Sequence, residues 1–157
     1  MPYRRATVYY STGTGNSYRA AVWSRQTLEA EVEGPLLASL TEAKPSQQLS
    51  ASPDQLLVMV MPSHGFTAPW TVLKSVCRLP RRSGAHAAVV ATRAGVKLGR
   101  LHPPGMSGSG TFIVALLLAL RGYRTRGALS VNMPSNWFSL HPMQSLQSHR
   151  QITEPRR

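Results

Sequence analysis

Runs of hydrophobic residues alternate along this chain with longer segments whose apolar residues recur at helical spacing. An unbroken apolar run predicts a strand that is buried on both faces, and the helical segments between the runs predict helices that cover those faces. The expected strands are residues 7–10, 31–37, 56–61, 87–92 and 128–131, and the expected helices are residues 16–29, 67–79 and 111–121. This alternation favours a three-layer α/β fold with a doubly wound, five-stranded parallel sheet.

Three segments fit this pattern less simply. Gly34 and Pro35 interrupt the second strand, which places it at an edge of the sheet or at a bend. Residues 41–53 are polar and contain two prolines, so only a short helix or a loop is expected there. Residues 93–109 are rich in glycine, proline and basic residues, which predicts a long loop of the kind that is usually functional or mobile.

The junction between the first strand and the first helix is the most informative part of the sequence. There the apolar run ends in small and hydroxyl-bearing residues, and helical spacing begins at once. A helix N-terminus offers unpaired N–H groups and a partial positive charge, glycines let the backbone approach an anion, and hydroxyl and amide groups donate further hydrogen bonds. This combination predicts a phosphate-binding loop that needs no lysine. Its candidate residues are Ser11, Thr12, Gly13, Thr14, Gly15, Asn16 and Ser17.

Competing interpretations of this loop differ in the residues that they require. A Walker A loop needs a lysine where this chain has Asn16, so nucleoside triphosphate hydrolysis is not expected. A dinucleotide-binding fingerprint needs a third small residue where Tyr18 stands, although Glu31 and Glu33 lie near the distance expected for a ribose-binding acid. The dinucleotide interpretation therefore stays open, as does an ordinary strand-to-helix turn that binds no ligand.

Residues 10–17, with the sequence Y-S-T-G-T-G-N-S, resemble the flavin mononucleotide (FMN) phosphate loop of flavodoxin-like proteins. The resemblance is greatest to flavodoxin domains with a Ser-Gly-Thr-Gly-Asn-Thr type of loop, which often precede a ferredoxin domain. Segments 58–72, 87–92 and 118–137 resemble, in order, that family's third strand with its flavin-contacting loop, its fourth strand, and its last helix with the fifth strand. The resemblance covers most of residues 4–138. It implies a flavodoxin-like strand order, 2-1-3-4-5, with FMN at the carboxyl ends of strands one and three.

The resemblance also implies roles for two further loops. In the second loop, Phe66 and Trp70 would present an aromatic plane to the flavin, unless they only cap the core of the following helix, and Gly65 would supply a peptide that changes orientation with the redox state. In the third loop, Arg93 or Lys97 would stabilise an anionic reduced flavin, unless either is a solvated surface charge. The candidate residues of these loops are Pro62, Ser63, His64, Gly65, Phe66, Thr92, Arg93 and Gly95.

Length and cysteine content narrow the architecture. A chain of 157 residues is expected to form one domain, here residues 1–138, followed by a basic polar tail, residues 139–157, that forms a weak terminal helix or is disordered. The single cysteine, Cys77, excludes an internal disulfide framework and a four-cysteine metal or iron–sulfur site within this chain. It stands in an apolar helical pattern, which predicts a buried position. His86 and His102 have no acids at metal-ligand spacing, so no metal site is expected.

Charge and hydropathy bear on partners and location. Eighteen Lys and Arg against six Asp and Glu give a formal net charge of +12, which favours attraction to acidic proteins, nucleic acid or anionic lipid. The basic residues are spread along the chain and are not interleaved with aromatic residues in a nucleic-acid module, so no specific nucleic-acid partner is expected. The longest apolar stretch, residues 112–120, is about half of what a membrane-spanning helix needs. No export signal is visible, and a cytoplasmic location is therefore expected.

These observations leave three functions open. The first is an FMN-binding redox protein that exchanges electrons with a partner protein, one that is acidic or carries an iron–sulfur cluster. The second is an NAD(P)H-dependent flavin or quinone oxidoreductase, and the third is a flavin-free interaction domain with the same fold. An oligomer is compatible with each of the three, and whether the chain is an enzyme stays open.

Overall fold

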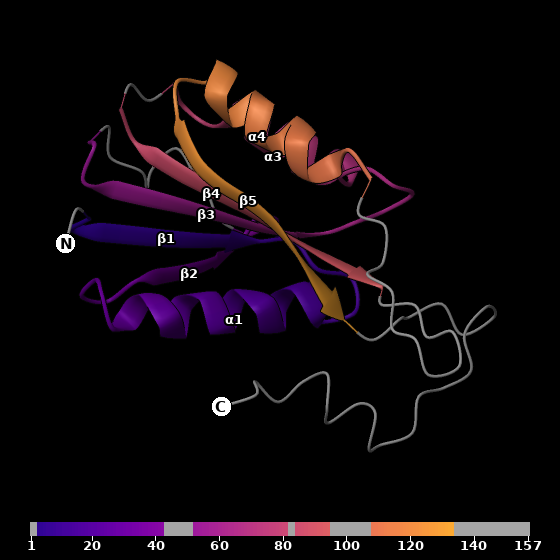
Figure 1. Ribbon diagram of the computed structural model, residues 1–157, viewed down its shortest axis with the longest axis horizontal. Coiled ribbons are helices and arrows are strands. Elements are labelled where there is room, and N and C mark those ends of the chain that lie inside the picture. Colours follow the sequence, from indigo (N-terminus) through magenta and orange to yellow (C-terminus); the bar gives the residue numbers. More distant parts are fainter. Residues whose placement is uncertain (1–2, 43–51, 82–83, 95–107, 134–157) are drawn as a thin grey trace.

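The computed structural model describes residues 3–42, 52–81, 84–94 and 108–133, which form a parallel β-sheet with helices on both faces (Figure 1). The elements in chain order are β1 (Arg5–Tyr10), α1 (Asn16–Glu29), β2 (Leu36–Ser39), β3 (Gln55–Pro62), α3 (Trp70–Arg78), β4 (His86–Ala94), α4 (Gly110–Leu120) and β5 (Arg124–Met133). The tail expected from the sequence, together with Gly95, Lys97 and His102, lies outside the described residues. The roles expected for these positions stay predictions.

The strands lie in the order β2-β1-β3-β4-β5, and every neighbouring pair is parallel. β3 occupies the centre, and all of its residues except Pro62 are buried, as expected for an apolar run that is covered on both faces. The doubly wound five-stranded sheet expected from the sequence is confirmed. Because all five strands run the same way, the loops that follow β1 and β3 come together with the carboxyl end of β4 at one edge of the sheet.

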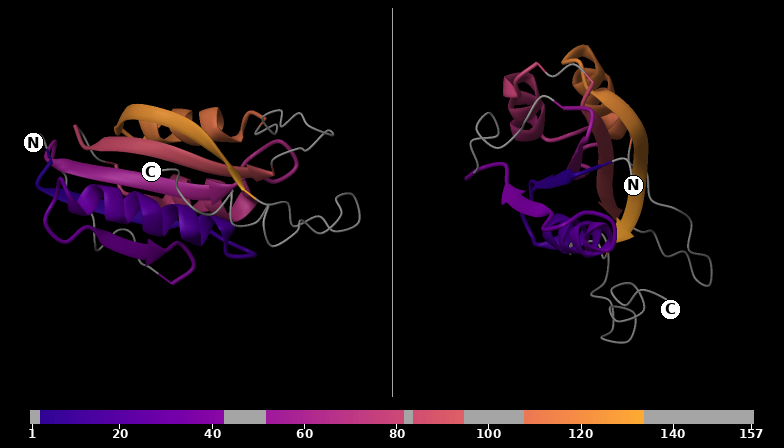
Figure 2. Two further views of the ribbon diagram at one scale, coloured as in Figure 1. Left: turned by 60° about the horizontal axis from the view of Figure 1, so that its bottom comes forward. Right: turned by 90° about the vertical axis from the view of Figure 1, so that its left-hand side faces the viewer.

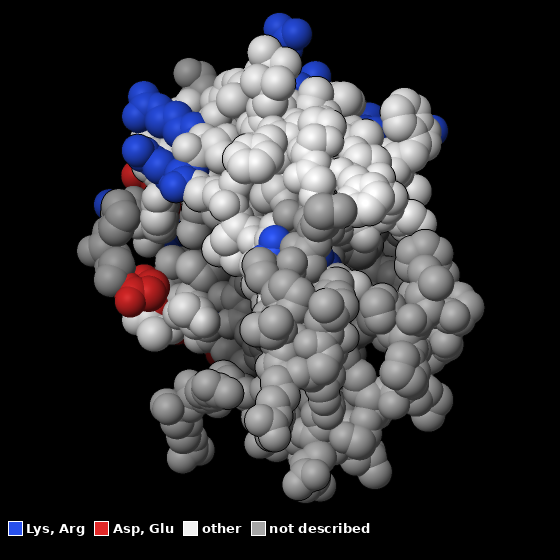
Figure 3. All heavy atoms as spheres, turned by 45° about the vertical axis from the view of Figure 1, so that its right-hand side comes forward, with Lys and Arg blue, Asp and Glu red and all other residues white. Residues whose placement is uncertain are grey.

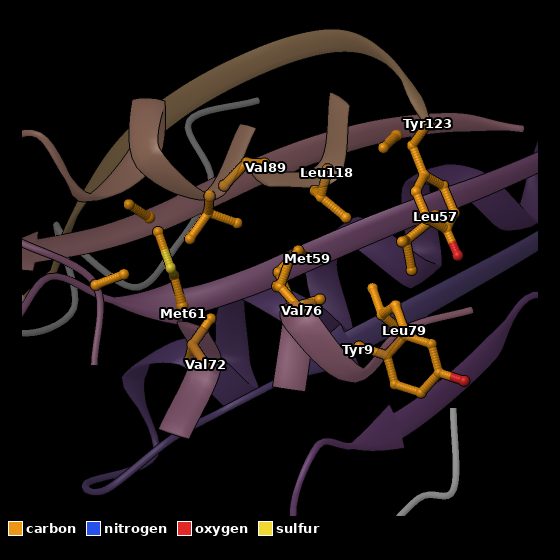
Figure 4. Close-up of a cluster of buried hydrophobic side chains, with 14 of the residues drawn as sticks. Tyr9, Leu57, Met59, Met61, Val72, Val76, Leu79, Val89, Leu118 and Tyr123 are labelled. Atoms are coloured by element: carbon orange, nitrogen blue, oxygen red, sulfur yellow. The ribbon is translucent and has the colours of Figure 1, made fainter. Parts of the chain in front are cut away.

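Each face of the sheet packs against its own helices and forms its own hydrophobic core (Figure 2). On one face, α3 and α4 cover a cluster that includes Leu57, Met59 and Leu118 (Figure 4). On the other face, α1 packs the small residues Ala20 and Ala21 into a cluster with apolar residues of β1 and β3. Small side chains at this contact let the helix lie close to the sheet, which places the first turn of α1 beside the end of β1.

The observed elements agree with the sequence-based expectation in the core and differ from it at the edges. α1 has the expected bounds. β2 begins after Gly34 and Pro35 instead of running through them, because Gly34 has a positive φ of 59° and turns the chain. β5 is longer than expected, since an edge strand tolerates polar residues on its open side. α3 begins later than expected, at Trp70, with Pro69 as its N-cap.

Cys77 is exposed, so the expectation of a buried thiol was wrong. In α3 the buried positions are Val72 and Val76, which pack into the core beneath the helix. Cys77 lies one position further round the helix, on the solvent side. The apolar pattern in this segment is wider than the face that the helix buries, and the sequence alone does not show where that face ends.

A buried histidine lies at the opposite edge of the sheet, where β4 begins. His86 is 9% exposed, its Nδ1 lies 2.7 Å from the hydroxyl of Tyr3, and Arg126 donates a hydrogen bond to its Nε2 at 3.1 Å. Because Nε2 accepts from Arg126, the neutral ring carries its proton on Nδ1 and donates to Tyr3. Burial lowers the pKa of His86 below its ordinary value of 6.5, and the positive charges of Arg126 and Arg124 lower it further.

This histidine should make the protein less stable in acid. Below a pH of about 6.5 the unfolded chain binds a proton at His86 more readily than the folded chain, so the free energy of unfolding falls as the pH falls. Above this pH His86 is neutral in both the folded and the unfolded chain, and it does not change the stability. His86→Gln keeps a neutral hydrogen-bonding side chain and should flatten this part of the profile, measured by urea unfolding at several pH values. Arg126→Gln should flatten it too, because it removes a charge that opposes protonation. An unchanged profile for His86→Gln would contradict the assignment.

Candidate functional site

The loops after β1 and β3 meet the end of β4 at the carboxyl edge of the sheet. The N–H of Ser11 donates to the carbonyl of Val60 at 3.0 Å, and the N–H of Ser63 donates to the carbonyl of Thr92 at 2.7 Å. These bonds fix the first residue of the loops after β1 and β3 to the neighbouring strand. The sheet thereby brings candidate residues from three distant parts of the sequence to one edge.

The first loop ends at an unusual helix start. Gly15 is the N-cap of α1, has a φ of 90°, and offers no side chain to cap the helix. Its N–H donates to the hydroxyl of Thr12 at 3.0 Å, which closes the loop. The first turn of α1 contains no acidic residue, so no side chain there neutralises the positive end of the helix dipole. A helix N-terminus in this condition is suited to an anion.

Among the described residues, none closes the space in front of the glycines of this turn. An added Cβ at Gly13 or at Gly15 would meet no atom within 4 Å, and Thr14 between them is exposed. The main-chain N–H groups of the first helical turn point along the helix axis toward this space. The donor set is therefore made of main-chain N–H groups, hydroxyls and an amide, which together fit a phosphate group.

Ser17 connects the start of α1 to the end of β4. It is 1% exposed, and its hydroxyl shares a 2.8 Å hydrogen bond with the hydroxyl of Thr92. Thr92 Oγ1 also lies 3.5 Å from the carbonyl oxygen of Met61, so the pair links the start of α1 with the ends of β3 and β4. The sequence predicts that the Ser17 hydroxyl contacts a phosphate; in the structure this hydroxyl makes an internal link, and the main-chain N–H is the group that Ser17 can offer to an anion.

Removing one hydroxyl of this pair should destabilise the protein. Thr92→Val keeps the shape of the side chain but leaves the buried Ser17 hydroxyl without its partner on β4, which should lower the free energy of unfolding by about 1–3 kcal/mol. The double variant Ser17→Ala/Thr92→Val should lose less than the sum of the two single variants, because neither hydroxyl is then left unpaired. Urea unfolding of the four proteins measures this coupling. Strictly additive losses would show that the bond does not stabilise the fold.

The second loop contains a tight turn with strained backbone. Two main-chain hydrogen bonds of 2.9 and 3.1 Å pair His64 with Thr67, and the two residues between them, Gly65 and Phe66, have positive φ values of 56° and 63°. Positive φ at both central positions is the mark of a type I′ turn, in which phenylalanine is disfavoured. Among the described residues Phe66 is the only non-glycine residue with a positive φ, and its side chain is 59% exposed. Strain of this kind costs about 1–3 kcal/mol and persists where the surrounding structure enforces it.

The start of α4 enforces this turn. The N–H of Ser109 donates to the carbonyl of Phe66 at 2.9 Å. A Cβ added at Gly108 would overlap the main chain of Phe66, and one added at Gly110 would lie 2.5 Å from the main-chain nitrogen of Ala68. Both positions therefore require glycine, and they clamp the second loop against α4. In the sequence these glycines mark only the beginning of a helix, because a single sequence does not show which loop they contact.

The end of β4 brings a basic side chain to the carboxyl edge. Arg93 Nε donates to Oδ1 of Asn132 on β5 at 2.8 Å, so the side chain is held in place by the neighbouring strand. Asn132 is a positioning residue to which the sequence assigns no role in the site. Thr92 is 4% exposed and belongs to the framework beneath the loop.

The remaining candidates of the second loop lie at the end of β3. Pro62 is the last residue of that strand, and Ser63 and His64 follow it.

The described part of the chain holds no group of three His, Cys, Asp or Glu side chains that could bind a metal ion. None of the helices described is both long and apolar enough to cross a bilayer. The site thus consists of main-chain donors, hydroxyls and a few aromatic and basic side chains.

Comparison with solved structures finds flavodoxins among the proteins of similar fold. A flavodoxin from the domain Archaea matches with a TM-score of 0.64 at 12% sequence identity, and the match covers 95% of this chain and 93% of that chain. Rubredoxin oxygen:oxidoreductase from Desulfovibrio gigas matches with a TM-score of 0.61 at 12% identity, covering 95% of this chain and 33% of that one. Fusobacterium nucleatum flavodoxin bound to flavin mononucleotide matches with a TM-score of 0.57 at 12% identity, covering 78% and 68%.

Neither a protein-family model nor a curated protein matches the sequence. The structural matches, together with the strand order, establish a flavodoxin-like fold for this chain. The fold expected from the sequence is thereby confirmed. In parallel sheets of this kind ligands bind beyond the carboxyl ends of the strands, which is the edge where the loops after β1 and β3 meet the end of β4.

Proposed function

We propose that this chain binds FMN at the carboxyl edge of its sheet and exchanges electrons with a partner protein. The observation that carries the proposal is the start of α1, where a glycine N-cap with a φ of 90° is followed by a first turn without acidic residues. A positive helix end without an acidic residue in its first turn, beside glycines and hydroxyls, suits the terminal phosphate of FMN. A solved flavodoxin that binds FMN has the same fold, which supports the choice of this cofactor.

The first loop would hold the phosphate. Thr12 Oγ1 accepts a hydrogen bond from the N–H of Gly15, so its own proton remains available to donate. The hydroxyl of Thr14, the amide of Asn16 and the main-chain N–H of Gly13 complete a donor set that is neutral apart from the helix dipole. These donors bind a phosphate by dipoles alone.

The second loop would lie against the flavin ring, which supplies the redox chemistry by taking up and releasing electrons. Gly65 adopts positive and negative φ equally well, so the peptide between Gly65 and Phe66 can turn either its carbonyl or its N–H toward the ring. Phe66, which is exposed, offers an aromatic plane for the flavin. The hydrogen bond from Ser109 limits this motion to the turn itself.

The charge of the site bears on the potential and on the partner. Arg93, held by Asn132, brings a positive charge to the carboxyl edge, and a positive charge near a flavin favours its reduced, anionic form. The net charge of +12 favours an acidic redox partner, one that carries an iron–sulfur cluster being an example. The proposal includes the cytoplasmic location that is expected from the sequence.

Absorbance spectra of the purified chain with added FMN test the proposal. We expect flavin bands that stay with the protein through gel filtration and that bleach on anaerobic reduction with dithionite. Reduction with NADH or NADPH in place of dithionite separates an electron carrier, which stays oxidised, from an NAD(P)H-dependent oxidoreductase, which bleaches. A protein that remains colourless after incubation with excess FMN would overturn the proposal and favour a flavin-free domain.

A further inference from the structure

The solvent face of α4 has the composition of a buried helix. No charged residue occurs in α4. Val114 and Leu118 are fully buried against the sheet, whereas Phe112, Leu116 and Leu120 are 72%, 60% and 69% exposed. A helix that is hydrophobic on every side is ordinarily covered on every side. Within the described part of the chain, one side of α4 is buried and the opposite side is exposed.

Phe112, Leu116 and Leu120 follow one another at intervals of four residues and form a line along the helix, which we call the α4 ridge. A further exposed aromatic residue, Trp70, is 74% exposed and begins the neighbouring helix α3. Figure 3 shows an extended area of uncharged atoms on this side of the molecule. Exposed apolar areas of this kind mark binding surfaces for proteins or membranes.

The surroundings of the α4 ridge are basic. Between Gln55 and Thr153 the sequence contains no Asp or Glu. Lys74 and Arg78 of α3 and Arg124 of β5 are exposed. In Figure 3, Lys and Arg atoms lie around the uncharged area, while acidic atoms lie away from it. A second copy of the chain would bring like charges together at this face, whereas an anionic surface would be attracted to it.

We propose that the α4 ridge and its basic margin dock this protein on the surface of an anionic lipid bilayer. The 11 residues of α4 extend over about 16 Å, too short for the ~30 Å hydrocarbon core, so the helix would lie in the interface. The α4 ridge would enter the acyl region, and Lys74 and Arg78 would meet the headgroups. The side chains of the α4 ridge offer no hydrogen-bond donor or acceptor, whereas protein–protein interfaces carry about ten hydrogen bonds. This difference favours lipid over an acidic protein.

Co-sedimentation with vesicles tests the proposal. We expect the full chain to sediment with vesicles of phosphatidylcholine and phosphatidylglycerol but not with phosphatidylcholine alone, and binding to weaken as salt is raised. The triple variant Phe112→Gln/Leu116→Gln/Leu120→Gln should bind about tenfold or more weakly, because it removes the apolar groups that enter the bilayer. Lys74→Gln and Arg78→Gln should each weaken binding roughly fivefold.

Leu36→Gln/Leu129→Gln is the matched control, since these leucines are 42% and 52% exposed on other parts of the sheet. It should bind vesicles as the wild type does, and circular dichroism verifies that each variant is folded. Absence of binding to the anionic vesicles would overturn the proposal, as would unchanged binding by the triple variant. A dimer in gel filtration that the triple variant abolishes, without lipid binding, would assign the α4 ridge to a second copy instead. FMN binding is measured separately, so its failure leaves this result intact.

Discussion

Replacing Gly15 with valine should lower the affinity for FMN by about 10- to 100-fold. Gly15 has a φ of 90°, which a β-branched residue adopts at a cost of about 1–3 kcal/mol. Because Thr12 and Thr14 are exposed, the free loop can relax away from this conformation, and FMN would have to restore it on binding. The valine side chain would also enter the open space before the first turn of α1. Titration of FMN fluorescence with each protein measures the change.

Gly34→Val is the control for the effect of strain alone. Gly34 also has a positive φ, 59°, and equally open surroundings, but it lies in the turn before β2, at the amino edge of the sheet. The same substitution there should lower the stability and leave the FMN affinity unchanged. If Gly15→Val binds FMN as tightly as the wild type, the helix start is not the phosphate site and the proposed function loses its main support.

The central elements of the fold are predictable from the sequence because their burial is visible in local patterns. β3 is apolar from Leu56 to Pro62, and α1 begins directly after a glycine that ends the preceding loop. Apolar runs separated by helical segments leave few ways to close a parallel sheet with right-handed connections, which explains why the strand order is confirmed. At the edges the patterns are weaker: polar residues of β5 stand on an open edge strand, and the apolar stripe of α3 continues past the buried face to Cys77.

The residues of the candidate site are predictable from the sequence only where they are neighbours within one loop. The phosphate-loop candidates are recognisable because their glycines, hydroxyls and amide are neighbours in the sequence. The hydrogen bonds that join the loops are not, since Ser17 meets Thr92 and Arg93 meets Asn132 only after the strands have paired. The strained turn at Phe66 is likewise absent from any local pattern, because the contact that enforces it comes from the start of α4.

Gly110→Val should lower the free energy of unfolding by about 3 kcal/mol. A Cβ at this position would lie 2.5 Å from both the main-chain nitrogen of Ala68 and the carbonyl carbon of Thr67, so the backbone must move. That movement would release the turn in which Gly65 and Phe66 hold positive φ. The affinity for FMN should therefore fall together with the stability, even though the substitution removes no donor from the site.

Gly127→Val separates this clamp from the general effect of replacing a glycine. A Cβ at Gly127 would meet no atom within 4 Å, and the residue lies in β5, where a β-branched side chain is favourable. We expect this variant to unfold in urea as the wild type does, or slightly later, and to bind FMN equally well. If Gly110→Val is as stable as Gly127→Val, α4 does not clamp the second loop. If Gly110→Val loses stability and keeps its FMN affinity, the clamp exists but the turn that it holds lies outside the flavin site.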